Sequence, residues 1–463
     1  MIKYLGFLLY IGGFMTYEHN FTQGKILAPL MKFALPVLLA MFLQALYGAV
    51  DLIIVGQFSD AVNVSAVSTG SQVIMTITMV VTGLAMGVTI LIGQKIGEGK
   101  PQEAGHVVGS GIHLFIIIGM LLTVIMVPGA GAVSALMQAP AEAFTETVQY
   151  VRICSAGFLF ITAYNVLGSV FRGIGDSKMP LITVMIATVI NVIGDLVFVA
   201  VFHWDAAGAA LATVIAQAVS VILSIFIIKR RTLPFEMKKK DISFDRLNTV
   251  RILKLGIPVA LQDLLVSISF LVILAIVNSM GVVYSAGLGV AEKLCMFIML
   301  IPSSYMQSMS AFVAQNIGAS KPERARKALL CGIGTSLIAG VIMFWLGFFH
   351  GDMLSMIFTG DAEIVVQAWD YLKAYAIDAM LTSFLFCFIG YFNGCGRTLF
   401  VMIQGLIGAF LVRIPVSYLM SISDEPNLFK IGLATPCSTL VQIIICGSVF
   451  MLLLHKEKRG KTA

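Results

Sequence analysis

The chain has 463 residues, of which 59% are hydrophobic and only 12% are charged, and its formal net charge is +6. Average soluble domains carry about 25% charged residues, so this composition, with a mean hydropathy of +0.96, excludes an ordinary soluble protein. A membrane span needs roughly 20 apolar residues plus a connection, so the length accommodates about a dozen spans and no separate soluble domain.

Twelve long apolar segments, separated by polar or turn-rich connections, follow one another along the chain. We predict an all-α integral membrane protein in which each segment is a transmembrane helix. The first six predicted helices lie near residues 26–57, 61–93, 104–127, 144–171, 179–202 and 206–228. The other six lie near residues 250–279, 284–314, 325–349, 365–392, 398–420 and 429–455.

Basic residues concentrate in every second connection, whereas the intervening connections carry mainly Asp and Glu. Because Lys and Arg are enriched in cytoplasmic loops, this alternation predicts a multi-pass protein of the cell membrane with both termini in the cytoplasm. The same alternation explains the net positive charge, so no nucleic-acid partner is expected.

The longest basic stretch lies at the middle of the chain and suggests the domain organisation. We expect a cytoplasmic leader (1–25), a six-helix lobe (26–228), a basic cytoplasmic linker (229–249), a second six-helix lobe (250–455) and a cytoplasmic tail (456–463). The linker contains Lys238, Lys239 and Lys240, which favour contact with anionic lipids. Met15 is a second candidate for the start of translation, because residues 4–14 are too short to span a membrane.

Matching segments reveal an internal repeat. The pattern Q-x-I-G-x-x-K-P-x-x-A occurs at residues 94–104 and again at 315–325, and F-x-G-x-G at 171–175 recurs at 392–396 with the same offset of 221. Pro36 and Pro258, 222 residues apart, open the two halves in the same way. Each half has an even number of spans, so we predict parallel repeats related by an axis along the membrane normal, with substrate between them. The alternative is ordinary helix punctuation by Gly and Pro.

The candidate acids inside the predicted spans are Asp51, Asp195, Asp263, Glu292 and Asp378. A charge at the bilayer centre is costly, by at least ~2.5–3.5 kcal/mol, so such residues are candidates for function. Asn191 precedes Asp195 by four residues and therefore shares its helical face. The alternative for Asp51 and Asp195 is that each pairs with a buried hydrogen-bond donor.

Taken together, the repeated Q-x-x-G-x-x-x-P segments, the Arg172-Gly-x-Gly-Asp176 turn, Asn191-Val-Ile-Gly-Asp195 and the two halves of six spans resemble the multidrug and toxic compound extrusion (MATE) family. The resemblance covers nearly the whole chain after Met15. It implies export of cationic or amphipathic organic compounds, driven by inward flow of sodium ions or protons through alternating outward-facing and inward-facing states.

The resemblance also implies which residues take part. It places Asp51, Asn191, Asp195 and Thr213 around one cation site, where the oxygen ligands suit sodium and the two acids equally suit a proton. If sodium is the coupling ion, Asp51 and Asp195 are its charged ligands. Glu292, together with Asp195, is the expected site for cationic substrates, and the alternative for Glu292 is a salt bridge with Arg413.

Other polar residues have weaker functional signals. Members of one branch use acids in the seventh and tenth spans, but Asp263 and Asp378 do not match those places convincingly, so packing roles are favoured. Asn165 matches a polar position of some members but lies nearer the cytoplasm, and His113 is a lone imidazole on an apolar helix. The seven cysteines include no CxxC pair and are expected to be free, packed thiols.

An enzyme and an ATP-driven pump are disfavoured, because HExxH, GxSxG and GxxxxGK[ST] motifs are missing from the sequence. We therefore expect a monomeric secondary transporter whose partners are organic cations, a coupling ion and membrane lipids, and which uses no cofactor. A channel remains an alternative, although duplication and buried acids favour alternating access. The closer alternative is a flippase for lipid-linked oligosaccharides, which would require a cationic cavity for a pyrophosphate headgroup.

Overall fold

The computed structural model describes residues 21–230, 233–236 and 242–460. Met15, most of the expected leader and Lys238–Lys240 lie outside the described residues. All regular secondary structure in the described parts of the chain is helical, as the composition predicts.

The described residues of the first half form seven α-helices, one 3-10 helix and one π-helix. In chain order these are α2 (Leu27–Phe58), α3 (Ala61–Gly97), α4 (Pro101–Leu136), η1 (Ala141–Ala143), α5 (Phe144–Ala156), α6 (Phe158–Ile174), α7 (Lys178–Asp195), η2 (Leu196–Val201) and α8 (Asp205–Arg230). The π-helix η2 continues α7 without a break, so the two form a single span.

The second half has a similar plan. Its helices are α9 (Arg246–Asn278), α10 (Val282–Gly318), α11 (Pro322–Met356), α12 (Ala362–Gly394), α13 (Thr398–Leu406), η4 (Ile407–Arg413), α14 (Ile414–Ser421), α15 (Leu428–Gly432) and α16 (Ala434–Gly460). The π-helix η4 joins α13 to α14 within one span.

Eleven helices of the described chain are long and apolar enough to cross a membrane, and a twelfth span is counted if the bent pair α5 and α6 is taken as one. The axis of this pair turns by 54° at Gly157. The predicted all-helical membrane protein is therefore confirmed, and the fourth predicted span is a broken helix.

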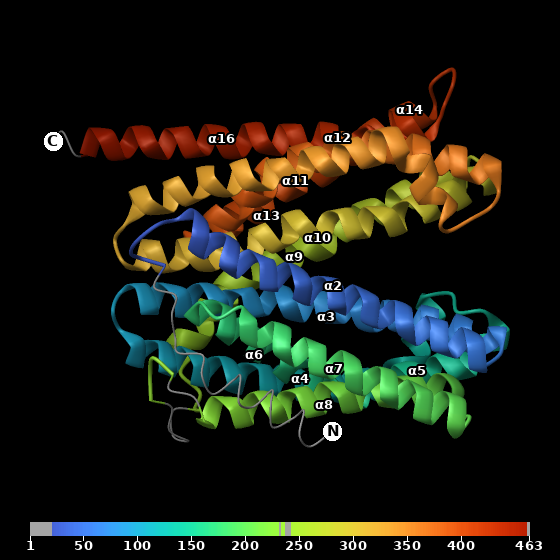
Figure 1. The fold of residues 1–463 in the computed structure, drawn as a ribbon, viewed down its shortest axis with the longest axis horizontal. Helices are drawn as coiled ribbons and strands as arrows, with labels where there is room; N and C mark the ends of the chain where they lie inside the picture. Colours follow the sequence, from blue (N-terminus) through green and yellow to red (C-terminus); the bar gives the residue numbers. More distant parts are fainter. Residues whose placement is uncertain (1–20, 231–232, 237–241, 461–463) are drawn as a thin grey trace. The chain divides into compact units, whose positions relative to one another are not determined.

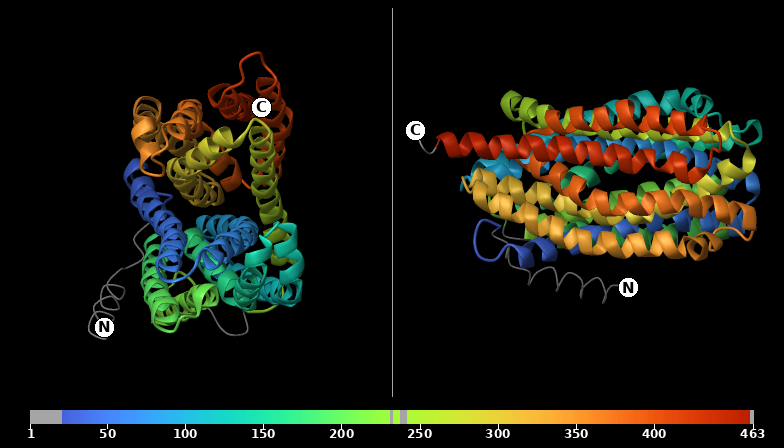
Figure 2. Two further views of the ribbon diagram at one scale, coloured as in Figure 1. Left: turned by 90° about the vertical axis from the view of Figure 1, so that its right-hand side faces the viewer. Right: turned by 90° about the horizontal axis from the view of Figure 1, so that it is seen from above.

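Contacts between residues divide the chain into two units, and within each unit the axes of the long helices are roughly aligned, with successive helices running in opposite directions (Figures 1 and 2). Unit 1 contains the chain up to Ala260 together with Ala314–Lys321, and unit 2 contains Leu261–Val313 and the chain from Pro322 onward. Helices α9 and α10 thus each contribute residues to both units.

The repeated sequence motif corresponds to the same turn in both halves. Helix α3 ends at Gly97 and α4 begins at Pro101, just as α10 ends at Gly318 and α11 begins at Pro322. Proline is favoured at the first position of a helix, where its missing N–H would have no partner. Between the helices, Gly99 and Ser320 occupy repeat-related positions, and both have positive φ, of 70° and 56°.

The glycines of this motif also allow close helix packing inside unit 1. A Cβ atom at Gly97 would overlap the backbone oxygen of Gln315, and a Cβ atom at Gly318 would overlap the backbone oxygen of Gln94. The Gln315 amide Nε2 donates a hydrogen bond to the Gly173 carbonyl at 3.1 Å. The two copies of the motif therefore contact each other reciprocally, which explains why glycine is required at both positions.

Candidate cation site

Two buried carboxylates lie at the centre of unit 1. Asp51 lies within the long helix α2 and is 4% exposed, and Asp195 is the last residue of α7 and is fully buried. Residues four apart share a helical face, so Tyr47 accompanies Asp51 and Asn191 accompanies Asp195. Each helix thus presents one acid and one neutral polar side chain.

Helix α8 completes the group. Its Thr213 hydroxyl donates a hydrogen bond to Asp51 Oδ2 at 3.5 Å, which is at the long end of the range for such bonds. The Asp51 carboxylate also lies close enough to interact with the side chains of Asp195 and Asn191. The structure therefore brings together Asp51, Asn191, Asp195 and Thr213, which come from three helices.

Several polar atoms of this group have no hydrogen-bond partner. They are Tyr47 Oη, Asp51 Oδ1, both amide atoms of Asn191 and both carboxylate oxygens of Asp195. A buried polar atom left without a partner costs about 1–3 kcal/mol, and more if it is charged. Such a cluster of unpartnered oxygens has the chemistry of a binding site for a hard cation or a proton.

The charge of the site supports the same interpretation. Asp51 and Asp195 form no ion pair with a Lys, Arg or His side chain among the residues that the structure describes. Nor does any cluster of three or more His, Cys, Asp or Glu side chains that could hold a metal ion occur there. Two carboxylates with neutral oxygens around them provide the oxygen ligands that suit a hard cation such as sodium, and the two acids equally suit a proton.

Tyr47 is a site residue that the sequence analysis did not identify. Its hydroxyl lies near Thr213 and its ring is close to both acids. The available signal was its position four residues before Asp51, the same spacing that identified Asn191 before Asp195.

A π-helix begins directly after Asp195. Residues Leu196–Val201 continue the span with this wider turn, and Phe198 then stacks on Trp204 with ring centroids 5.4 Å apart. Short π-helical segments are rare in proteins and are found frequently at functional sites. Asp195 is thus placed at a change in helix geometry.

The other polar residues considered in the sequence analysis lie outside the group around Asp51. In unit 1, Asn165 accepts a hydrogen bond from Thr82 at 3.0 Å and donates one to the Ile161 carbonyl at 2.8 Å, so its side chain is satisfied. His113 lies beside the Phe244 ring at 6.1 Å. Neither residue belongs to the group around Asp51.

In unit 2, Glu292 is exposed on α10 and Asp263 is half-buried on α9. The alternative of a salt bridge between Glu292 and Arg413 is not realised within the described chain, because the Arg413 guanidinium donates its hydrogen bond to Ser269 instead.

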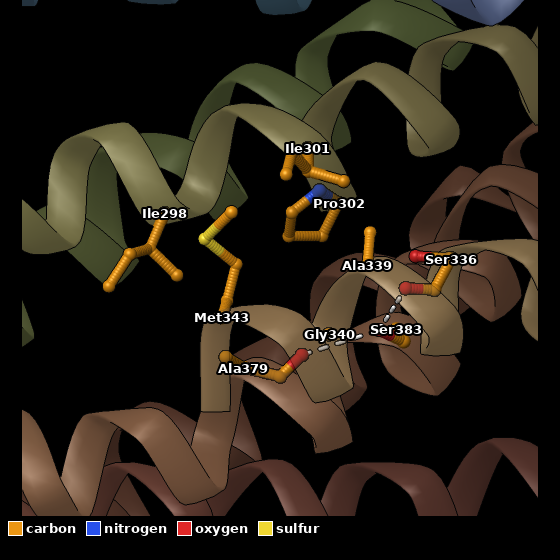
Figure 3. A pocket seen from close by; sticks show the side chains of 9 residues that line it. All are labelled: Ile298, Ile301, Pro302, Ser336, Ala339, Gly340, Met343, Ala379 and Ser383. Atoms are coloured by element: carbon orange, nitrogen blue, oxygen red, sulfur yellow. Dashed lines mark hydrogen bonds between the residues drawn. The ribbon is translucent and has the colours of Figure 1, made fainter. Parts of the chain in front are cut away.

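A small cavity in unit 2 is not part of this site. Apolar side chains of Ile298, Pro302 and Met343 line most of it, together with Ser336 and Ser383 (Figure 3). Its free volume for a water-sized sphere is about 10 Å³, close to the minimum for one water molecule. It is therefore far too small for an organic substrate.

Comparison with known proteins identifies relatives over almost the whole chain. The sequence model of the MatE family matches residues 36–197 and again residues 258–419, which confirms the predicted duplication. The chain is 28% identical to "Probable multidrug resistance protein YpnP" of Bacillus subtilis, covering 87% of this chain and 90% of that protein. It is 23% identical to "Multidrug export protein MepA" of Staphylococcus haemolyticus, covering 96% of both chains.

Solved structures show the same fold. The outward-facing conformation of a multidrug resistance MATE family transporter of the MOP superfamily matches with a TM-score of 0.89 and 21% identity, covering 96% of this chain and 99% of that chain. A crystal structure of MATE in complex with MaL6 also gives a TM-score of 0.89, at 20% identity. The two matched halves, the helical architecture and these relatives agree, and the chain belongs to the MatE family of membrane transporters.

Proposed function

We propose that the protein is a secondary active multidrug efflux antiporter, which exports cationic or amphipathic organic compounds in exchange for Na⁺ or H⁺ by alternating access. The observation that carries this proposal is the pair of buried carboxylates, Asp51 and Asp195, whose oxygens are largely unpartnered and which form no ion pair within the described parts of the chain. The names of the relatives, a probable multidrug resistance protein and a multidrug export protein, support the substrate class.

Coupling follows from the electrostatics of the site. Two carboxylates close together in a low-dielectric environment repel each other, so a proton or a sodium ion must accompany them. A cation that binds one conformation of the transporter better than the other shifts the equilibrium between them, by no more than its difference in affinity. If the drug competes for the same equilibrium, entry of the ion drives exit of the drug.

Glu292 and Asp195 are proposed to attract the cationic substrate. Glu292 is exposed and forms no ion pair with Arg413, so its carboxylate is available to a cationic compound. Charge complementarity of this kind contributes mainly to specificity. Asp195 links the substrate to the coupling ion, because it belongs to both proposed sites.

Transport in proteoliposomes tests the proposal directly. Sodium and proton gradients are imposed separately on vesicles that contain the wild-type protein, the Asp51→Asn, Asp195→Asn double variant, or Asp263→Asn as a matched intramembrane control. We expect one gradient to drive uphill transport of a cationic dye in the wild type and the control, and neither gradient to do so in the double variant. Full uphill transport by the double variant would refute the site.

The alternative flippase function makes a different prediction. Arg413 is 6% exposed and packs against Ser269 and Phe270, so it is not presented to a pyrophosphate headgroup. Cells that express the protein should accumulate less ethidium-like dye than cells with an empty vector, with unchanged turnover of lipid-linked oligosaccharides. The opposite pair of results would favour the flippase.

The proposed orientation places both termini in the cytoplasm, as the distribution of Lys and Arg predicts. Labelling of a cysteine introduced at Asp361 or Lys327 with a membrane-impermeant reagent in intact cells tests this orientation. We expect labelling at position 361, which lies in an acidic connection, and none at position 327.

A further inference from the structure

Helices α2 and α8, which carry Asp51 and Thr213 of the candidate cation site, are joined where α2 ends and α8 begins. We call this the outer end of unit 1, because it lies opposite to the repeated motif turns. There the Ser59 hydroxyl donates a hydrogen bond to Asp205 Oδ1 at 2.7 Å, a length typical of a well-formed bond. The two residues are 146 positions apart in the sequence, so the bond ties together two separate turns.

The cation site lies at the same depth below this bond on both helices. Asp51 precedes Ser59 by eight residues on α2, and Thr213 follows Asp205 by eight residues on α8. Eight residues correspond to about 12 Å along a helix. The two helices run in opposite directions, so the Ser59–Asp205 bond and the Asp51–Thr213 bond connect them at two successive levels.

An apolar layer separates these two levels. Val55 lies midway between them on α2 and Ala209 midway on α8, and both are fully buried members of one cluster of core residues. Cys154 of α5 belongs to the same cluster, and its Sγ lies 4.0 Å from the Ala210 carbonyl oxygen of α8. A charge that enters an apolar layer loses its solvation, so this layer excludes cations while the helices stay packed.

The turn that carries Asp205 has an unusual backbone. His203 and Asp205 have φ of 55° and 47°, in the left-handed region that residues other than glycine rarely adopt. Such conformations persist only where the surrounding contacts hold them, and they are common in switch segments. Here the Trp204 ring stacks on Phe198 with the ring planes 3° apart, and the Trp204 N–H donates to the Phe198 carbonyl at 2.8 Å. Contacts with η2 and the bond from Ser59 therefore hold this turn.

Asn63 of α3 makes a second connection across the outer end. Its Oδ1 accepts a hydrogen bond from the Ala206 N–H of α8 at 3.2 Å, and its Nδ2 donates to Asp60 Oδ1 at 2.9 Å. Asp60 Oδ1 also accepts the Asn63 backbone N–H and thereby caps α3. The first N–H groups of a helix have no partner within it, so one carboxamide satisfies the start of α8 and ties it to the start of α3.

The corresponding positions of unit 2 do not make the same contact. At the offset of 222 between the two MatE matches, Ser59 corresponds to Gly281 and Asp205 to Asn427. Gly281 has no side chain to donate a bond, and the Asn427 side chain accepts the Lys430 N–H instead. Within the described chain, the bond across the outer end is therefore confined to the half that contains the candidate cation site.

We propose that the hydrogen bonds of Ser59 and Asn63 to the start of α8 form an outer latch, which must open before a cation can reach or leave Asp51 and Asp195 from this end of unit 1. Asp51 is 4% exposed and Asp195 is fully buried, so the site is closed while the outer latch is formed. The latch keeps the apolar layer packed between α2 and α8. This inference rests on the proposed function and deepens it, because it concerns access to the same site.

Labelling of the native Cys154 thiol measures opening of the outer latch in the full-length protein. The probe is a methanethiosulfonate with a trimethylammonium group, which is itself a monovalent cation, and peptide mass spectrometry identifies the labelled cysteine. Ser59→Ala and Asn63→Ala each remove hydrogen bonding from the latch, and one such bond is enough to shift an opening equilibrium about two- to tenfold. We expect Cys154 to be labelled faster by that factor in both variants than in the wild type.

Two control variants separate the outer latch from general loosening of the protein. Asp205→Asn keeps a side-chain oxygen that can accept from Ser59, so Cys154 should be labelled at the wild-type rate. Ser110→Ala removes a hydrogen bond of 2.9 Å within α4, elsewhere in unit 1, and should also leave the rate unchanged. Equally fast labelling in Ser110→Ala, or an unchanged rate in folded Ser59→Ala and Asn63→Ala variants, would overturn the proposal.

A cross-link across the outer latch gives the opposite perturbation. Ser59→Cys and Asp205→Cys are combined, and the two thiols are joined by a short bis-methanethiosulfonate in proteoliposomes. The cross-linked protein should lose uphill dye transport and exchange of ²²Na⁺, or of protons reported by a pH-sensitive dye, and dithiothreitol should restore both. Wild-type protein treated with the same reagent should transport normally. Full transport by the cross-linked protein would overturn the proposal.

The two experiments also distinguish failure of the outer latch from failure of the proposed function. If neither a sodium nor a proton gradient drives dye transport by the untreated wild type, the proposed antiport fails. Labelling of Cys154 does not require transport, so the rates in Ser59→Ala and Asn63→Ala still decide whether the latch closes the site.

Discussion

Units 1 and 2 share one helical plan but place their charges differently. In unit 1 the acids of the candidate cation site lie on the first and fifth spans, at Asp51 and Asp195. At the offset of 222 between the two MatE matches, the corresponding residues of unit 2 are Ile273 and Ser417. Of the candidate acids in unit 2, the buried one lies instead on the tenth span, at Asp378. Helix packing is thus maintained by residues that both halves retain, whereas the charge of each site depends on a few side chains that are free to diverge.

The broken span shows the same contrast. Helix α5 ends before Gly157, where the axis bends by 54°, whereas α12 runs continuously from Ala362 to Gly394. With the offset of 221 that holds for these spans, Gly157 corresponds to Asp378. The Val214 side chain lies where a Cβ at Gly157 would be. Unit 1 therefore packs a helix against this position, and unit 2 uses it for a carboxylate.

The largest expected difference in dye efflux is between variants at Asp195 and variants at its repeat-related residue, Ser417. Asp195→Asn removes a charge that the coupling cation needs, so uphill dye efflux should fall to the level of the empty vector. Ser417→Ala should change it less than about twofold, because only one neutral hydroxyl is lost. Efflux from energised cells, normalised to the amount of folded protein in the membrane, measures both. Similar losses in the two variants would remove the proposed functional difference between the units.

Substitution of the motif glycines tests the feature that both halves retain. Gly97→Val and Gly318→Val each force a side chain into the backbone of the facing helix, and overpacking of this kind costs about 1–3 kcal/mol. We expect similar reductions of Tm for the two variants. Gly129→Val and Gly334→Val are matched controls, since a Cβ at either position meets no atom within 4 Å. A large loss of Tm in only one of the two motif variants would show that the reciprocal contact is unequal.

A smaller effect is expected at Thr213 of the cation site and at Thr435, its repeat-related residue in unit 2. Thr213→Ala removes the hydroxyl that donates to Asp51, and one such bond contributes about 0.5–1.5 kcal/mol. The concentration of coupling ion needed for half-maximal transport should therefore rise about two- to tenfold. Thr213→Ser should retain most of the affinity, and Thr435→Ala should leave it unchanged. A shift caused by Thr435→Ala would imply that unit 2 also binds the coupling ion.

The smallest expected effect concerns Glu292, which has Ser71 as its repeat-related residue. Exposed charge interactions contribute about 0.2–1 kcal/mol, so Glu292→Gln should weaken export of monocations relative to neutral compounds by a few fold at most. Ser71→Ala should not change this ratio. Competition between a cationic dye and a neutral amphipathic compound in the same vesicles measures the selectivity, and an unchanged ratio would exclude Glu292 from substrate recognition.

The spans were predictable from the sequence because each is marked by its own composition, and the predicted ends of α2 and α3 differ from the observed ones by only a few residues. The break at Gly157 was not predicted, because the segment is apolar on both sides of it and hydropathy does not record the direction of a helix axis. The two π-helical segments were missed for the same reason.

Some residues of the candidate site were predictable from the sequence and others were not. An acid in an apolar span is conspicuous, and so is a polar residue four positions away on the same helix, as Asn191 is from Asp195. Tyr47 was not identified, and Arg413 was considered only as a salt-bridge partner of Glu292, because their contacts depend on which helices pack together. Tyr47 approaches Thr213 of α8, and Arg413 donates to Ser269 of α9; neither contact is encoded by local spacing.

The reciprocal contact between the two motif copies also bears on the origin of the chain. Gly97 faces Gln315 while Gly318 faces Gln94, which is the pattern of an isologous interface, where residue i meets residue j and j meets i. A six-helix ancestor that carried the motif once could form both contacts by pairing with a second copy of itself. Fusion of two such copies would have made a symmetric homodimer into a single gene product, after which each half could acquire its own charges without losing its partner.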